Sequence, residues 1–193
     1  MEKNGVSTDR VVIIGGSAGS LDIILKVVST LPVHSNAAFI IVVHRKNDDG
    51  SILRDLLATR TLMMVREVED KDPILPNQIY LAPPDYHLLI ENPNAFSLDS
   101  SEKINYSRPS IDVSFQSVAD VFGRGVIAVL LSGANADGAA GLEKVRLAGG
   151  VTVVQDPTTA EMEFMPREAI ARGPIDKVVP AQELPELINS LLQ

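Results

Sequence analysis

Three polar residues that follow apolar runs carry the side chains that an acyl-transfer site needs. Ser17 follows the run VVII and two glycines, His44 directly follows AFIIVV, and Asp137 lies in SGANADG after VIAVLL. A hydroxyl nucleophile, an imidazole base and a carboxylate that orients the base form such sites on unrelated folds. Because the carboxyl ends of parallel strands gather at one edge of a sheet, we expect the three side chains to meet there.

The glycine-rich turn GGSAGS, residues 15–20, is open to two interpretations. A dinucleotide fingerprint needs glycine at its third and sixth positions, but counting from Gly15 these positions hold Ser17 and Ser20. The Gly-Lys-Ser/Thr of a phosphate loop is also absent from the sequence. Residues 15–19 instead match Gly-x-Ser-x-Gly, the strand-to-helix turn that exposes a serine hydroxyl. The small residues predict room for an acyl group, and the next helix offers N–H groups to an oxyanion.

The order of the three residues narrows the class further. The α/β-hydrolases run Ser, Asp, His, whereas here the order is Ser17, His44, Asp137, which argues against an ordinary lipase or esterase. Each residue also has a structural alternative. Ser17 can cap the helix that starts near Ser20, His44 can be a plain loop histidine, and Asp137 can cap a helix over 138–148.

Short apolar runs alternate with helical patterns and predict the elements that carry these residues. In residues 21–31 apolar side chains recur at three- and four-residue spacing, which is typical of a helix. The other expected helices are residues 110–122, 137–148 and 182–192. The expected strands are residues 11–14, 38–43, 62–66, 78–82, 87–91, 126–131, 151–154 and 176–179.

These elements predict an α/β fold with a doubly wound, mostly parallel sheet flanked by helices. Runs that are apolar on both faces, such as VIAVLL, are typical of the centre of a covered parallel sheet. Residues 62–106 differ, because strand follows strand there with Pro and Asn turns. We therefore expect an antiparallel hairpin region there, appended to the sheet.

Composition limits the classes of protein and of partner. The 193 residues fit one domain, which we place at residues 11–193 after a disordered leader at residues 1–10. A net charge of −8 argues against nucleic acid as a partner, since phosphate binding needs clustered Lys and Arg. No apolar run approaches the roughly 18 residues of a membrane span, and no secretory signal is present, so a cytoplasmic protein without membrane insertion is expected. Without Cys or metal-ligand spacing, no metal site is expected.

Seven ordered motifs occur between residues 11 and 192. They are IGGSAGS, VVHR, IYLAPPDYHL, SRPSIDVSFQSVA, LLSGANADGAAGL, AGGVTVVQDP and MPREAI. Together they resemble the catalytic domain of the chemotaxis receptor methylesterase family, CheB. The resemblance implies a cofactor-free enzyme that hydrolyses glutamate γ-methyl esters on chemoreceptor helices and releases methanol. Some members also deamidate receptor glutamines.

The resemblance also implies a role for individual residues. Ser17 would be the nucleophile, His44 its general base and Asp137 the carboxylate that orients the base. The backbone N–H groups of Ala18 and Ala134 would bind the oxyanion.

Four residues depart from the family pattern and bear on substrate preference more than on chemistry. Ser20 stands where Gly is usual, and Arg45 where an apolar residue is frequent. Ser107 takes a place often held by His, and Ala134 replaces a common Met. A further residue, Arg108, either borders the substrate cleft or is a structural arginine that holds its loop.

The implied partners are methylated chemoreceptor helices or another methylated signalling protein, with a paired methyltransferase. The full-length family enzyme carries a phosphorylatable receiver. Because the first catalytic strand here begins at Val11, we expect this chain to act without one. The alternative is a catalytically silent regulatory or binding module of the same fold in a non-chemotactic pathway.

Overall fold

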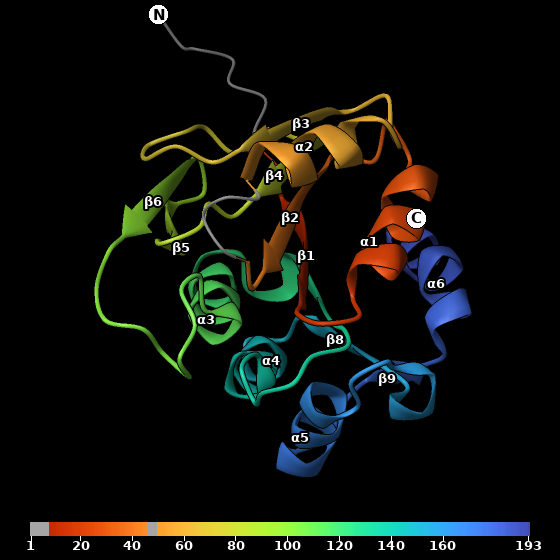
Figure 1. The fold of residues 1–193 in the computed structure, drawn as a ribbon. Coiled ribbons are helices and arrows are strands. Elements are labelled where there is room, and N and C mark those ends of the chain that lie inside the picture. Colours follow the sequence, from red (N-terminus) through yellow and green to blue (C-terminus); the bar gives the residue numbers. More distant parts are fainter. Residues whose placement is uncertain (1–7, 46–49) are drawn as a thin grey trace, which may run out of the picture.

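The computed structural model describes residues 8–45 and 50–193. Seven parallel strands form the main sheet, in the order β3-β4-β2-β1-β7-β8-β9 (Figure 1). β2 pairs with one side of β1 and β7 with the other, so the strand order reverses at β1. Ligand sites of open α/β sheets lie at the carboxyl ends of strands beside such a reversal. The strands are β1 (Arg10–Gly16), β2 (Ala37–Val43), β3 (Met64–Glu67), β4 (Gln78–Leu81), β7 (Val126–Leu130), β8 (Val151–Gln155) and β9 (Lys177–Val179).

Helices cover both faces of this sheet, as the doubly wound prediction requires (Figure 1). On β1, Val11 and Ile13 pack into one core, whereas Val12 and Ile14 pack into the core on the opposite face. This alternation explains why the central strands are apolar on both faces. One face carries α3 (Ile111–Phe122), α4 (Ala139–Leu147) and α5 (Phe164–Arg172), and the other carries α1 (Leu21–Thr30), α2 (Gly50–Ala58) and α6 (Leu184–Leu191). Short 3-10 turns lie at Gly123–Gly125, Pro157–Thr159 and Ala181–Glu183.

The expected antiparallel hairpin is present and is shorter than residues 62–106. Antiparallel pairing joins β5 (His87–Asn92) to β6 (Ala95–Asp99), and this pair packs on the α3 side of the sheet. β3 and β4 lie in the same stretch of sequence but join the main sheet as parallel strands. β3 and β4 can pair in parallel because the connection over residues 68–77 returns the chain to the end of the sheet at which β3 began.

Three elements were not expected from the apolar pattern: α2, β6 and α5. In α5 only Met165, Pro166 and Ala169 are buried, so its nine residues carry a weak helical signal. The helix forms because Met165 and Ala169 pack into the core against the sheet. Tertiary contact therefore stabilises a segment whose own pattern is weak.

The predicted leader, residues 1–10, lies mostly outside the described residues. Within its described part, Thr8 is buried and its hydroxyl donates to the carbonyl of Asn36 over 2.8 Å. Arg10 already belongs to β1. Thr8 and Arg10, which the sequence assigned to the leader, therefore belong to the fold. Among the helices of the described residues, none combines the length and apolar character needed to cross a membrane.

Candidate active site

Ser17 and His44 follow neighbouring strands at the same edge of the sheet. Gly16 lies opposite Val43 in the β1–β2 ladder, so Ser17 and His44 are the next residues on the two strands. The amide of His44 donates to the carbonyl of Gly16 over 3.3 Å, which extends the ladder by one step. Both residues line one cavity of about 270 Å³. The sheet register therefore brings together two residues that are distant in sequence.

Asp137 is buried beside the imidazole of His44. Its Oδ2 lies 2.7 Å from Nε2 of His44. The side chain of Asp137 is 0% exposed and that of His44 13% exposed. Asp137 reaches this place from β7, which pairs with β1 on the side away from β2. Because Nε2 faces the carboxylate, Nδ1 is the ring nitrogen left to accept a proton from a hydroxyl.

The N-terminus of α3 holds the carboxylate of Asp137. The backbone amides of Ile111 and Asp112 donate to it over 2.6 and 3.0 Å, and the hydroxyl of Ser110 over 2.8 Å. The free amides and the positive end of a helix dipole favour an anion at this position. Asp137 does not cap the helix that follows it, because α4 is preceded by Gly138 and has no side-chain cap. The helix that Asp137 caps is therefore α3, which begins 26 residues earlier in the chain.

The two neighbouring carboxyls, Asp137 and Asp112, have opposite pKa shifts. Burial raises the pKa of Asp137, but hydrogen bonds from His44, two backbone amides and Ser110 outweigh burial and hold this pKa below its usual value. Burial also raises the pKa of Asp112, which the charge of Asp137 raises further against the lowering effect of backbone amides. Nδ2 of Asn105 lies 3.0 Å from Asp112 and 3.5 Å from Asp137. The ionised Asp137 is suited to stabilise a positively charged imidazole.

Ser132 ties the loop after β7 to the turn that carries Ser17. The amide of Ser17 donates to the carbonyl of Ser132 over 2.9 Å, and the hydroxyl of Ser132 donates to the carbonyl of Ala18 over 2.7 Å. Within the described residues the amides of Ala18 and Ala134 donate no hydrogen bond. These are the two N–H groups expected to bind an oxyanion, and they remain free for that role. Ser132 itself was not expected as a site residue; its only sequence signal was its place as the first polar residue after the apolar run VIAVLL.

A hydroxyl lies near the second ring nitrogen of His44. Oγ of Ser107 is 3.4 Å from Nδ1, and Nδ2 of Asn135 donates to the same Oγ over 3.3 Å. Asn135 also accepts from the amide of Asp137 over 3.1 Å. The loop before α3 and the loop after β7 are therefore linked around the imidazole. In the part of the chain that the structure describes, no hydrogen bond joins Ser17 to His44, and such bonds often tighten only when substrate binds.

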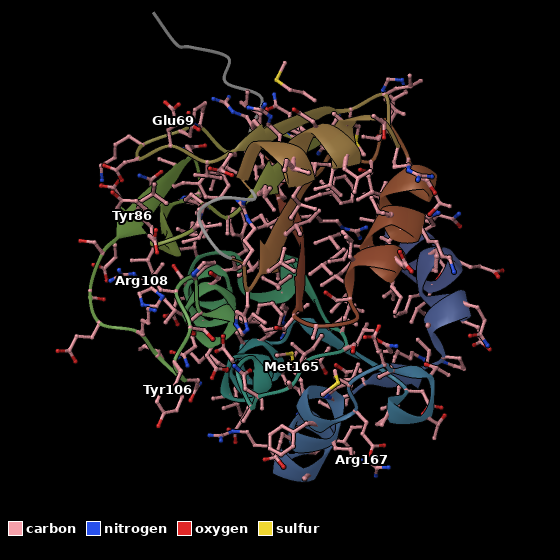
Figure 2. All side chains as sticks on the ribbon, in the orientation of Figure 1. Glu69, Tyr86, Tyr106, Arg108, Met165 and Arg167 are labelled. Carbon is pink, nitrogen blue, oxygen red and sulfur yellow. The ribbon has the colours of Figure 1, made fainter. Side chains whose placement is uncertain are left out.

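Arg108 lines a cleft beside His44 and is also held by carbonyls of its own loop. It lines a second cleft of about 390 Å³, and its Nη1 donates to the carbonyls of Ser100 and Ser101 over 2.7 Å each. Figure 2 shows Arg108 and Tyr106 on the loop between β6 and α3. The residues that line the cleft are His44, Arg45, Asp85, Lys103, Tyr106, Ser107 and Arg108.

The two glycines before Ser17 leave space that side chains of neighbouring residues occupy. A Cβ on Gly15 would lie 2.5 Å from Ile111, and one on Gly16 would lie 2.6 Å from Cβ of Ser20. Ser20 is buried, and its hydroxyl donates to the carbonyl of Ser17 over 2.7 Å. The expectation that these glycines leave space for an acyl group is therefore wrong. Ser20, one of the departures from the family pattern, occupies the space that Gly16 leaves open.

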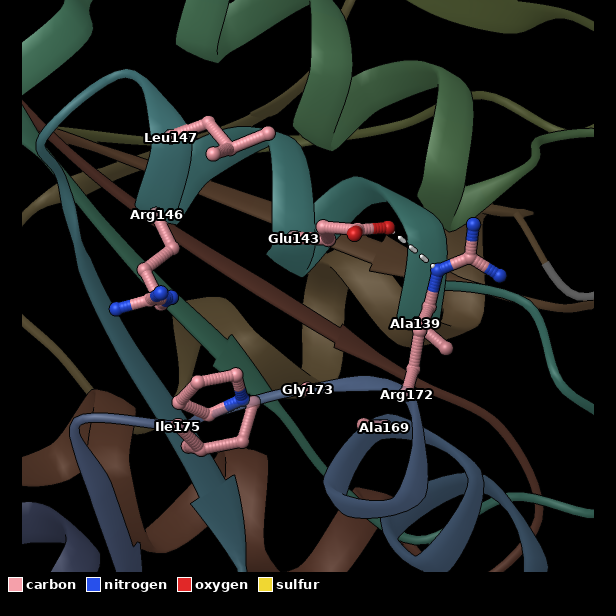
Figure 3. Close-up of a pocket in the computed structure, with 9 residues that line it drawn as sticks. Ala139, Glu143, Arg146, Leu147, Ala169, Arg172, Gly173 and Ile175 are labelled. Carbon is pink, nitrogen blue, oxygen red and sulfur yellow. Dashed lines mark hydrogen bonds and ion pairs between the residues drawn. The ribbon is translucent and has the colours of Figure 1, made fainter.

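A smaller pocket of about 90 Å³ lies between α4 and α5 (Figure 3). Arg172 of α5 pairs with Glu143 of α4 there over 2.8 Å. None of the residues that line this pocket carries a hydroxyl or an imidazole, so it contributes nothing to acyl transfer. Over residues 8–45 and 50–193, no group of three or more His, Asp or Glu side chains is arranged to hold a metal ion.

Comparison with known proteins agrees with this geometry. A family model described as CheB methylesterase matches residues 12–188, a range that includes Ser17, His44 and Asp137. The chain belongs to the CheB methylesterase family. The crystal structure of the CheB methylesterase catalytic domain of Thermotoga maritima is 32% identical, with a TM-score of 0.89. The match covers 94% of this chain and 98% of that one.

Two sequence relatives differ in how much of their own length this chain covers. A protein of Leptospira interrogans is 41% identical over 183 residues, and the match covers 94% of both chains. The protein-glutamate methylesterase/protein-glutamine glutaminase of Bordetella bronchiseptica is 37% identical over 190 residues. That match covers 96% of this chain and 54% of the relative. The chain thus spans about half the length of this CheB relative.

Proposed function

We propose that this chain is a protein-glutamate methylesterase that hydrolyses glutamate γ-methyl esters on chemoreceptors or another methylated signalling protein. The observation that carries the proposal is the 2.7 Å contact of His44 with buried Asp137, beside the cavity that Ser17 lines. The names of relatives such as the Bordetella enzyme support the same reaction. A methyltransferase that forms the ester is the enzyme expected to act before it.

The mechanism proposed from this geometry is acyl transfer through Ser17. The Ser17 oxygen bonds to the ester carbonyl carbon while its proton passes to Nδ1 of His44. The amides of Ala18 and Ala134 stabilise the oxyanion, and Asp137 stabilises the imidazolium. The C–O bond to methoxide then breaks, and His44 returns the proton, so methanol leaves. Water, deprotonated by the same imidazole, attacks the glutamyl ester and regenerates Ser17.

The same machinery supports glutaminase activity as a second candidate function. The names of the curated relatives pair the two activities. With a glutamine side chain the acyl-enzyme is the same, and the leaving group that His44 protonates becomes ammonia. Methylesterase and glutaminase activity would therefore share one nucleophile.

Replacement of Ser17 tests both activities. Ser17→Ala should lower methanol release from a methylated receptor cytoplasmic domain by at least about 10³-fold, since the other hydroxyl that lines the cavity, that of Ser20, is buried and donates to the carbonyl of Ser17. Ammonia release from the glutamine form of the receptor should fall in parallel. Circular dichroism spectra and melting temperatures of the two proteins provide the folding control.

Two results would contradict the proposal: no methanol from the wild-type protein, or equal release by Ser17→Ala. Capture of a partner without any hydrolysis would support the silent binding module instead. The hydrogen-bonded His44–Asp137 pair and the two free amides favour turnover over that alternative.

A further inference from the structure

The cavity that contains Ser17 and the cleft that contains Arg108 meet at His44 and differ in the polarity of their lining residues. The cavity that contains Ser17 is lined largely by apolar side chains, namely Leu21, Val43, Ile52, Leu53 and Leu56. The cleft on the other side of His44 is polar, and three of its lining residues, Arg45, Lys103 and Arg108, are cationic. A substrate segment that crosses His44 would therefore contact mainly apolar side chains on one side and cationic side chains on the other.

Two of the three cations keep their charge free for a ligand. Arg45 pairs with Glu67, and its side chain is only 6% exposed. Neither Lys103 nor Arg108 forms an ion pair with a carboxylate of the described residues. Two backbone carbonyls hold the Arg108 guanidinium in place, but they do not neutralise its charge. This excess of positive charge lies in a chain whose net charge is −8.

The described residues also place acidic groups at or near the cleft. Asp85 lines it, and Glu102 is exposed next to Lys103 in the chain. Asp99 is near enough for Arg108 to contribute to lowering its pKa, but the main cause is the hydroxyl of Ser101, which donates to its carboxylate over 2.6 Å. Among the described residues that line the cleft itself, three are cationic and only Asp85 is acidic, so the lining carries a net positive charge that favours an anion.

We propose that Lys103 and Arg108 form a cationic subsite that binds a carboxylate of the substrate beside the glutamate methyl ester. The inference rests on the proposed function and names the partner chemistry: an amphipathic segment with acidic residues on one side of the ester and apolar residues on the other. The apolar side chains contact the cavity at Ser17, and the acidic ones contact the loop between β6 and α3 (Figure 2). Lys103 and Arg108 are specificity-determining residues and take no part in proton transfer.

Two matched peptides test the subsite. Each carries one γ-methyl glutamate; in the first the neighbouring residues are glutamates, and in the second they are glutamines. The wild-type protein should show a kcat/KM for methanol release that is roughly threefold to fivefold higher on the acidic peptide, the range expected of one exposed ion pair. Raising NaCl from 0.05 to 0.5 M should bring this ratio toward one, because salt screens exposed charges.

Variants of Lys103 test whether this residue causes the preference for the acidic peptide. Lys103→Gln should lower the ratio of the two kcat/KM values, and Lys103→Glu should reverse the preference. Lys177→Gln makes the same charge change on the edge strand β9, four strands away from β2 in the sheet, and should leave the ratio as in the wild type.

The outcomes separate the subsite from the activity. Equal kcat/KM on both peptides, or an acidic preference that survives Lys103→Glu, would overturn the subsite while leaving the methylesterase proposal intact. Absence of methanol from both peptides and from the methylated receptor domain would overturn the proposed function and the subsite with it.

Discussion

The carboxylate of Asp137 shows how much a single side chain depends on its surroundings here. It has no exposed surface, yet it accepts hydrogen bonds from His44, from Ser110 and from two backbone amides. A buried carboxylate with this many donors is stabilised as the anion, so its pKa falls on folding although burial alone would raise it. The side chain that orients His44 is thus also a contributor to stability.

Replacement of Asp137 should make stability less dependent on pH. A carboxyl whose pKa is lower in the folded chain stabilises the fold above about pH 4, its unfolded value, and this contribution disappears as the pH falls through the folded-state pKa. Asp137→Asn should therefore lower the free energy of unfolding by roughly 1.5–3 kcal/mol at pH 7. The difference from the wild-type protein should shrink at pH 3.

Urea unfolding at pH 7 and pH 3 provides the measurement. Asp120→Asn, which removes an exposed carboxylate of α3 that pairs with Lys144, should change stability little at either pH. An equal loss for Asp137→Asn at both pH values would show that the carboxylate charge does not stabilise the fold.

At the scale of elements, close packing of β1 against its neighbours shapes the turn that carries Ser17. Gly16 ends β1, and Ser20 directly precedes α1. The Cβ of Ser20 lies where a side chain on Gly16 would have to be. The absence of a side chain on Gly16 therefore lets Ser20 pack against the end of β1.

A double-mutant cycle tests this contact. Gly16→Ala should lower the free energy of unfolding by about 1–3 kcal/mol, the usual effect of overpacking. Adding Ser20→Gly should recover part of that loss, because the clashing atoms are removed. Gly173→Ala is the matched control: nothing lies within 4 Å of its Cβ position, so stability should barely change. Additive effects of Gly16→Ala and Ser20→Gly would mean that the two residues do not interact.

At the scale of the whole molecule, two aliphatic cores on opposite faces of one sheet hold the fold together. Phe39 of β2 is 1% exposed and lies in the core on the face that carries α1, α2 and α6. Neighbouring residues of the same strand, such as Ile40, enter the other core. Because the strands are shared, loss of packing on one face is expected to weaken the other as well.

Truncation of Phe39 measures this coupling. Phe39→Ala should lower the free energy of unfolding by about 3–5 kcal/mol, the range for a buried aromatic residue. Thermal unfolding followed by circular dichroism should still show a single transition, at a lower temperature. Met64→Ala, on the edge strand β3 with its side chain 60% exposed, should change stability by less than about 0.5 kcal/mol. Two separate transitions for Phe39→Ala would contradict a shared sheet.

The sequence by itself determined the class of fold and the residues at the strand ends. Apolar runs such as that of β7 and the helical spacing in α1 are local patterns, and strand ends in a parallel sheet share one edge whatever their order. That is why Ser17, His44 and Asp137 could be named together before any distance was known. The short helix α5 could not, because its few buried residues leave little local pattern.

Only the tertiary structure decided what surrounds these residues. The amides of α3 reach Asp137 across 25 and 26 residues of sequence, and the hydroxyl of Ser132 reaches Ala18 across 114. Lys103 and Arg108 likewise line the same cleft as His44 from a loop far along the chain. Such contacts follow from how the elements dock, and docking is set by side-chain packing over the whole chain, which no local periodicity encodes.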